Sequence, residues 1–193
     1  VNSLQDRGRT TMLVARDKVV LGVIGVMDAP RAESRPTLAR LRAAGVGELV
    51  LISGDNQPVA QAVGLAVGAD TAVGGLLPHD KVLAIQELSG RGRVTCMVGD
   101  GVNDAPAMAH AGLGIAMGAA GSPVALETAD IALMADDLGR VPFLVRLGRQ
   151  TSRIIRQNLF AALAVVAVLV PAALLGVEIG PIVILHEGST IIV

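Results

Sequence analysis

Charged side chains almost disappear after Arg156, and this asymmetry limits what the chain can fold into. Of the 33 charged residues, only Glu178 and Glu187 lie beyond that point. The segment Leu159–Val177 (LFAALAVVAVLVPAALLGV) has no charge over 19 residues. As a helix it would span roughly 28 Å, close to the ~30 Å hydrocarbon core of a bilayer. We therefore predict a transmembrane helix, kinked at Pro171, in preference to a buried helix of a soluble core.

Basic residues precede this apolar segment and none follows it. Five arginines lie just before it, namely Arg140, Arg146, Arg149, Arg153 and Arg156. The positive-inside rule then predicts that the N-terminal region is cytoplasmic.

A second apolar stretch begins at Pro181, after a short Gly/Pro break. It contains His186, Glu187, Ser189 and Thr190. Ionisable residues inside a membrane segment are costly and indicate a functional site. The same residues are also compatible with an ordinary luminal loop, and the pattern alone leaves both interpretations open.

The first 156 residues carry 16 basic and 15 acidic groups and have the composition of a soluble domain. Apolar runs rich in β-branched residues alternate there with helical patterns. This alternation predicts an α/β fold, with a parallel sheet wrapped by helices on both faces. We expect strands at Val19–Met27, Leu49–Ile52, Val94–Val98, Leu113–Met117 and Ile131–Met134, and helices at Glu33–Ala44, Asn56–Val67, Pro78–Leu88, Asp104–Ala109 and Ser122–Thr128.

Composition excludes several functional classes. A formal net charge of −1 is not that of a nucleic-acid binder. The single cysteine, Cys96, excludes a disulfide scaffold, and its place in an apolar run predicts a buried core residue. Val1–Asp17 has no apolar core segment, so we expect no secretory signal there.

Two predicted strands end in polar loops that should meet at one edge of the sheet. Ser53-Gly54-Asp55-Asn56 follows the first, and Gly99-Asp100-Gly101-Val102-Asn103-Asp104 follows the second. Glycines allow close backbone approach to a phosphate. Asp100 and Asp104 are hard oxygen ligands suited to Mg²⁺, and Lys81 can neutralise a phosphoryl group.

These motifs resemble those of a known family. GDGVNDAPAM (Gly99–Met108) is similar to the hinge signature of P-type ATPases, and SGDN resembles the TGDN loop of that family. The spacing to Lys81 and the segment MDAPRAESRP (Met27–Pro36) fit the phosphorylation domain, which has a haloacid-dehalogenase-like fold. RIIRQNL (Arg153–Leu159) resembles the heavy-metal-transporting branch, and HEGST (His186–Thr190) resembles the last-helix motif of its cobalt/zinc-type subgroup.

The resemblance implies roles for individual residues. Asp100 and Asp104 would hold Mg²⁺, and Asn103 would complete the phosphate and metal surroundings. Ser53, Gly54, Asp55 and Lys81 would bind the phosphoryl group, with Ser53 standing where the family more often has Thr. Asp100, Asp104, Lys81, Ser53 and Asn103 would together form the catalytic set. His186, Glu187, Ser189 and Thr190 would contact the transported metal, for which imidazole favours Zn²⁺, Co²⁺ or Ni²⁺.

No DKTG motif occurs in the sequence, so the aspartate that accepts phosphate in this family is absent. We expect the C-terminal portion of a multi-pass plasma-membrane pump with a cytoplasmic phosphorylation domain. Its partners would be membrane lipid, the N-terminal part of the same pump and the transported metal, with ATP as substrate. The expected divisions are 1–26 (tail of a nucleotide-binding domain and entry strand), 27–138 (phosphorylation domain), 139–177 (linking and transmembrane helix) and 181–193 (start of a second transmembrane helix).

Two other hypotheses stay open at this stage. A membrane-anchored pseudo-enzyme or regulatory fragment would bind Mg²⁺ and phosphate without catalysis. The other is a pump for a different ion, against which only the HEGST motif argues.

Overall fold

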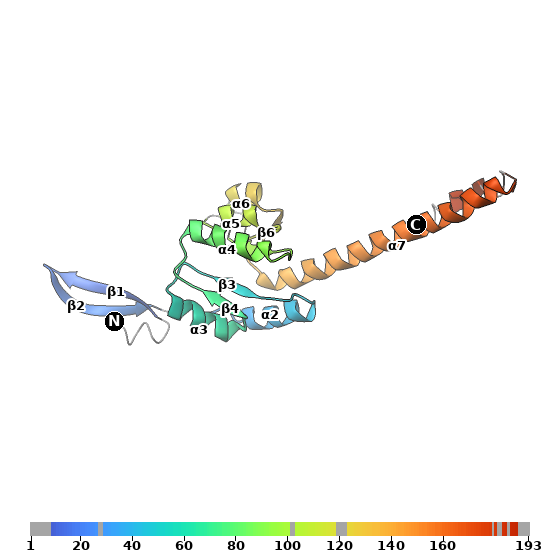
Figure 1. Cartoon of the computed structure of the whole chain (residues 1–193). Helices are drawn as coiled ribbons and strands as arrows, with labels where there is room; N and C mark the ends of the chain where they lie inside the picture. Colours follow the sequence, from blue (N-terminus) through green and yellow to red (C-terminus); the bar gives the residue numbers. More distant parts are fainter. Residues whose placement is uncertain are drawn as a thin grey trace. The chain divides into compact units, whose positions relative to one another are not determined.

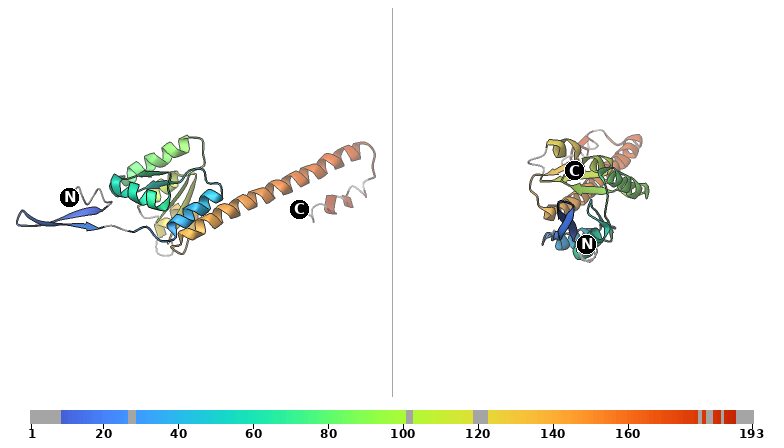
Figure 2. Two further views of the ribbon diagram at one scale, coloured as in Figure 1. Left: turned by 90° about the horizontal axis from the view of Figure 1, so that it is seen from below. Right: turned by 90° about the vertical axis from the view of Figure 1, so that its left-hand side faces the viewer.

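The computed structural model describes residues 9–26, 29–100, 103–118, 123–178, 180, 183–184 and 186–188. It forms two compact units, residues 1–142 and residues 143–193, which are considered separately. Figure 1 shows the helices and strands in chain order, and Figure 2 gives two further views.

The first unit begins with a β-hairpin. Strands β1 (Thr10–Arg16) and β2 (Val19–Val26) pair antiparallel. Asp17 and Lys18, which connect them, both have positive φ, as a two-residue hairpin turn requires. Apolar side chains are exposed on both faces of the hairpin, because neighbouring residues such as Met12 and Leu13 point to opposite sides and are 53% and 60% exposed.

The next elements form a small parallel sheet with two helices. Strands β3 (Val50–Ile52) and β4 (Thr71–Val73) pair in parallel. They are connected by α3 (Gln57–Val67), and α2 (Ser34–Ala43) precedes β3. The α3 helix begins and ends as its sequence dictates: Asn56 caps it by accepting from the Val59 N–H, and Gly68 ends it with φ +83°. Figure 1 shows α2 and α3 on the same side of this sheet.

A second parallel sheet follows the helix α4 (Pro78–Gly90). Its strand order is β5 (Cys96–Gly99), β6 (Leu113–Met117) and β7 (Ile131–Leu133). The short helices α5 (Ala105–His110) and α6 (Pro123–Thr128) connect these strands. Cys96 is exposed, contrary to our expectation, because it opens the outermost strand of the sheet.

The strands that follow α2 are parallel as expected, but they form two sheets where the sequence suggested one. The strand expected at Val19–Met27 is not part of either, because it pairs antiparallel in the hairpin as β2. Within the described residues no strand pairs with the second edge of β3 or with the outer edge of β5. The two halves share a hydrophobic core instead. Ile52 of β3 and Val82 of α4 pack against it; its buried members are Ile85, Met97, Ala105, Ala107, Met108 and Ala116.

The long apolar helix expected at the C-terminal end is present. After a short 3₁₀ turn, η2 (Leu138–Arg140), the helix α7 runs without interruption from Val141 to Leu174. It is long and apolar enough to cross a membrane. Pro171 lies inside it, and Gly176 (φ +84°) ends it: the Gly176 and Val177 N–H groups donate to the Ala173 and Ala172 carbonyls, the pattern of a Schellman motif.

The side chain of Asp70 links α2 to the residue just before β3. The ionisation of this carboxylate provides a test of the contact. The Asp70 carboxylate accepts hydrogen bonds from the Leu49 N–H at 2.8 Å and from Arg42 at 2.6 Å, and these interactions lower its pKa. A lowered pKa in the folded state stabilises the fold above the unfolded pKa, and this contribution is lost as pH falls through the folded value.

We expect Asp70→Asn to destabilise the detergent-solubilised chain at pH 7 in urea unfolding followed by circular dichroism. The difference from the wild type should shrink as pH falls below 3.8, because the carboxylate of the unfolded wild type is protonated first and the folded carboxylate, whose pKa is lowered, follows at lower pH. Asp17→Asn in the hairpin turn is the control, since its ion pair with Arg16 is highly exposed. A destabilisation by Asp70→Asn that does not change with pH would contradict this account.

Candidate functional site

The loop after β3 is folded by its own polar groups. The Ser53 hydroxyl donates to Asp55 Oδ2 at 3.1 Å and accepts from the Asp55 N–H at 3.1 Å. The Asp55 carbonyl accepts from the Gly75 N–H. A Cβ at Gly74 would lie 2.7 Å from the Asp55 carbonyl oxygen, so only glycine fits beside this loop. The predicted residues Ser53, Gly54 and Asp55 therefore lie in a tight turn at the carboxyl end of β3.

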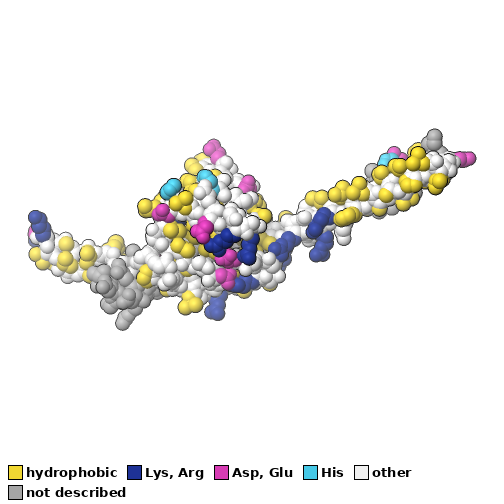
Figure 3. All heavy atoms as spheres, in the orientation of Figure 1, with side chains coloured by type: hydrophobic (Ala, Val, Ile, Leu, Met, Phe, Trp, Pro, Cys, Tyr) yellow, Lys and Arg dark blue, Asp and Glu magenta, His cyan; other side chains and the backbone are white. Residues whose placement is uncertain are grey.

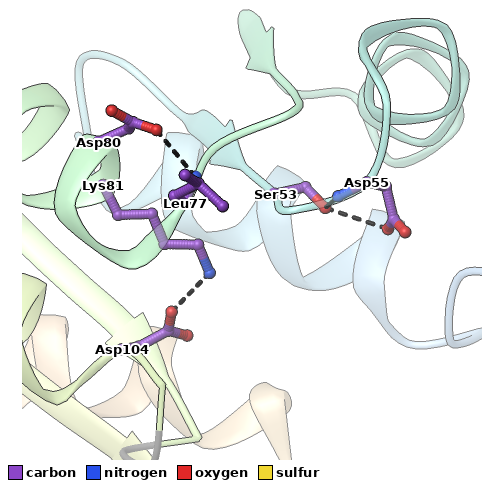
Figure 4. A network of polar contacts seen from close by, with 6 residues as sticks. All are labelled: Ser53, Asp55, Leu77, Asp80, Lys81 and Asp104. Carbon is purple, nitrogen blue, oxygen red and sulfur yellow. Dashed lines mark hydrogen bonds and ion pairs between the residues drawn. The ribbon is translucent and has the colours of Figure 1, made fainter.

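This turn is connected directly to the helix that carries Lys81. The Ser53 carbonyl accepts from the Leu76 N–H at 3.1 Å, which holds the chain just before α4. Pro78 opens the helix, and Asp80 accepts from the Leu77 N–H at 3.0 Å. The first turn of α4 is thus fixed on both sides, and it places Lys81 beside the loop after β5 (Figure 4).

An ion pair between Lys81 and Asp104 is the centre of the site. Lys81 Nζ lies 2.6 Å from Asp104 Oδ1, and the two side chains are only 15% and 17% exposed. Partial burial strengthens such a pair relative to one at the surface. Figure 4 shows Lys81 reaching from α4 toward Asp104, across from the Ser53 loop. Two of the predicted site residues, 23 positions apart in the sequence, are therefore in direct contact.

Gly99 makes room for this pair. A Cβ at this position would lie 2.7 Å from Asp104 Oδ2 and 2.9 Å from Asp104 Cβ. Any side chain at residue 99 would therefore displace the carboxylate that binds Lys81. The loop motif in the sequence contains Gly99 but carries no signal for this steric role.

The remaining residues of this loop are accessible. Asp100 and Asn103 are exposed, and residues 101–102 lie outside the described part of the chain. Asp100 leaves the carboxyl end of β5, and Asp104 begins α5 only four residues later. Two carboxylates so placed fit Mg²⁺, which proteins hold through one or two carboxylates together with phosphate oxygens and water.

Two further side chains position the site and were not singled out from the sequence. Gln57 holds the end of β4 by donating to the Ala72 carbonyl at 3.0 Å and accepting from the Gly74 N–H at 2.6 Å. Asp80 holds the start of α4, as described above. A carboxylate two positions after a helix-opening proline is a recognisable signal for such a role.

The residues predicted to bind a transported metal are not assembled into a metal centre by the described part of the chain. His186 and Glu187 are helical, whereas Ser189 and Thr190 lie outside the described residues. Among the described residues, no group of three or more His, Cys, Asp or Glu side chains lies close enough to hold a metal ion. These four residues stay predictions.

An apolar pocket of about 240 Å³ lies apart from the predicted site residues. It is formed by α2, β3, α3 and η2; its lining includes Leu38, Leu49, Leu51, Val63, Val67 and Leu138. Its lining is mainly apolar and contains no charged side chain, so it does not suit a phosphate or a metal ion.

Comparison with known proteins identifies a family for the first unit. A model described as haloacid dehalogenase-like hydrolase matches residues 1–112. That range includes the Ser53 loop, Lys81 and the loop from Gly99 to Asp104.

Similar proteins extend the match to the second unit. A probable cadmium-transporting ATPase of Staphylococcus aureus is 44% identical over 165 residues, covering 86% of this chain and 20% of the relative. A probable cation-transporting ATPase G of Mycobacterium bovis is 42% identical over 194 residues, covering all of this chain and 25% of the relative. The chain thus spans about a fifth to a quarter of the length of these curated relatives.

A solved structure is similar in fold as well as in sequence. The crystal structure of a zinc-transporting PIB-type ATPase in the E2·Pi state superposes with a TM-score of 0.83 at 40% identity, covering 99% of this chain and 31% of that one. This agreement supports the α/β fold followed by a long apolar helix.

The tight contact between Gly99 and Asp104 predicts the effect of a single methyl group. We expect Gly99→Ala to lower the free energy of unfolding by about 1–3 kcal/mol, the usual cost of overpacking, and to separate Lys81 from Asp104. Gly47→Ala is the matched control, because a Cβ there meets no atom within 4 Å. Thermal unfolding of both variants checks this, and equal melting temperatures for the two would show that Gly99 has no steric role.

Proposed function

Because the chain belongs to the haloacid dehalogenase-like hydrolases, we propose that it is the C-terminal part of an ATP-driven efflux pump for divalent transition metals. The observation that carries the proposal is the partly buried Lys81–Asp104 pair, which joins α4 to the loop after β5. A fixed cation beside two carboxylates at the ends of parallel strands suits the binding of a phosphoryl group and Mg²⁺. The similarity to cadmium-transporting, cation-transporting and zinc-transporting ATPases supports metal as the cargo.

The phosphoryl acceptor would be an aspartate outside this chain, as the absence of DKTG requires. We infer that the segment carrying it adds a strand between β3 and β5, each of which has one edge that pairs with no described strand. The carboxyl end of such a strand would lie between the Ser53 loop and the loop after β5. An aspartyl phosphate formed there would be within reach of both loops.

Each site residue then has a distinct task. Lys81 donates to phosphoryl oxygens as a point charge, and Asp104 keeps the Lys81 ammonium aimed into the site before the phosphoryl group arrives. The Ser53 hydroxyl and the Asn103 amide bind further phosphoryl oxygens. Asp100 and Asp104 would hold Mg²⁺, which would neutralise charge on the transferring group. Phosphoryl transfer depends on this kind of positioning and electrostatic stabilisation.

Transport would be coupled to this chemistry through α7. The helix begins at Val141 and continues without a loop into its apolar half, so displacement of one end is transmitted along its length. His186 and Glu187, with Ser189 and Thr190, would contact the metal in the following segment. An imidazole with a carboxylate favours Zn²⁺, Co²⁺ or Ni²⁺ over Mg²⁺ or Ca²⁺. The pump would be a multi-pass protein of the plasma membrane with its phosphorylation domain in the cytoplasm.

The test uses the longer polypeptide that contains this sequence, purified and reconstituted in vesicles. We expect Cd²⁺ or Zn²⁺ to stimulate ATP hydrolysis. Asp100→Asn should lower the stimulated rate by about 100-fold or more, the loss typical when one group stabilising the transferring charge is removed. The variant keeps the volume of the side chain and removes only its charge.

Asp17→Asn in the hairpin turn is the matched control and should leave the stimulated rate unchanged. Metal-stimulated hydrolysis that survives Asp100→Asn would overturn the assignment of this site. A native polypeptide that lacks an upstream phosphorylatable aspartate would instead support a pseudo-enzyme that binds Mg²⁺ and phosphate without turnover.

A further inference from the structure

Four arginines form a single stripe on the first half of α7. Arg146, Arg149, Arg153 and Arg156 are spaced three, four and three residues apart. At 3.6 residues per turn these positions fall within an arc of about 80° around the helix axis. All four side chains are exposed, and Figure 3 shows Lys and Arg gathered on this part of α7, with hydrophobic side chains beyond it.

The charge of this arginine stripe is not balanced within α7. The helix contains no Asp or Glu over its 34 residues. Like charges three or four residues apart repel one another along a helix. Among the described residues, Arg146, Arg153 and Arg156 form no ion pair, whereas Arg140, just before the helix, pairs with Asp137 at 3.3 Å. Arg146, Arg153 and Arg156 are therefore available to an anionic partner other than the described side chains.

The position of the stripe indicates what that partner is. Arg156 lies three residues before Leu159, or about 4.5 Å along the helix axis, and Arg153 lies about 9 Å before it. The headgroup layer on each side of a bilayer is roughly 5–8 Å thick. Arg153 and Arg156 therefore reach that layer with their side chains, while Arg146 lies about 20 Å away, beyond a Debye length from the lipid surface.

The short apolar half of α7 draws the same two arginines toward the membrane. From Leu159 to its end at Leu174 the helix is 16 residues long, or about 24 Å, which is less than the ~30 Å hydrocarbon core. A span that is too short is accommodated when flanking basic residues extend to the interface. Arg156 is the first such residue on the cytoplasmic side.

We propose that Arg153 and Arg156 bind the phosphate groups of anionic lipids in the cytoplasmic leaflet, with Arg149 adding a weaker attraction. The guanidinium group matches a phosphate through two parallel hydrogen bonds, which an ammonium cannot reproduce. The site takes the headgroup of an acidic phospholipid such as phosphatidylglycerol. This inference rests on the proposed function, because it requires that α7 crosses a membrane.

The experiment measures which lipids the full 193-residue chain retains. The chain is reconstituted into nanodiscs that contain equal amounts of phosphatidylglycerol and phosphatidylcholine, and the lipids that stay bound are counted by native mass spectrometry. We expect the wild type to prefer phosphatidylglycerol by about fivefold or more, the effect of one basic residue near an anionic surface. The preference should weaken when the salt concentration is raised from 0.05 M to 0.5 M.

Matched variants locate the effect on the helix. Arg153→Gln/Arg156→Gln should reduce the preference nearly to one, and Arg156→Gln alone should reduce it severalfold. Arg146→Gln removes the same charge from the same stripe and should leave most of the preference. Arg153→Lys/Arg156→Lys should keep part of it, and circular dichroism confirms that each variant retains its helix.

Three outcomes would overturn the proposal. A wild-type chain without lipid preference would indicate that the stripe binds an acidic protein surface instead. An equal loss of the phosphatidylglycerol preference in Arg146→Gln and Arg156→Gln would show a diffuse charge effect. A preference that survives Arg153→Gln/Arg156→Gln would place the lipid elsewhere.

Extraction of the membranes with alkaline carbonate separates this test from the proposed function. A chain that alkaline carbonate extracts does not span the membrane, which contradicts the proposed function. A chain that stays in the membrane but shows no lipid preference contradicts only the lipid site.

Discussion

The ion pair between Lys81 and Asp104 is the constraint on which the geometry of the first unit depends. The sheet β3–β4 and the sheet β5–β6–β7 share no backbone hydrogen bond among the described residues. They are joined by α4, which contacts the Ser53 loop at its start, presents Lys81 one turn later and buries Ile85 in the common core. A change in the Lys81–Asp104 distance therefore alters the geometry between two loops from different sheets. A phosphoryl group that recruits Lys81 would act on this connection.

The unbroken helix α7 determines the geometry of the second unit. A helix of 34 residues is about 51 Å long and has no loop that could absorb a displacement along it. The first half carries the arginine stripe and the second half is apolar, so one continuous helix joins a charged segment to an apolar one. The Schellman motif at Gly176 ends the helix soon after Pro171 and fixes the length of its apolar part.

Local signals in the sequence predicted most of the elements, and long-range pairing explains what they missed. Asn56, Pro58 and Gly68 define the ends of α3 through capping and backbone preferences that act within a few residues. Strand β4 was not predicted, because its three residues have no periodicity and depend on pairing with β3. The division into two sheets was missed for a related reason, since strand neighbours are set by tertiary contacts.

The candidate site was also predicted only in part from local sequence signals. The resemblance of GDGVND and SGDN to family motifs identified Lys81 and Asp104 as members of one site, and the structure pairs them. Their direct contact and the need for glycine at residue 99 depend on how α4 packs beside β5, which no local pattern records. His186 and Glu187 stay predictions, because a metal centre needs ligands from several helices and the described part of this chain contains only one long helix.

The hairpin β1–β2 has a practical consequence for any preparation of this chain. Both of its faces expose apolar side chains, and a two-stranded hairpin is marginally stable without further layers. The edges of β3 and β5 that pair with no described strand are further surfaces that invite strand-to-strand association. Handled apart from other protein, the chain exposes these surfaces to further copies of itself, so its colloidal behaviour has to be controlled before its folding is measured.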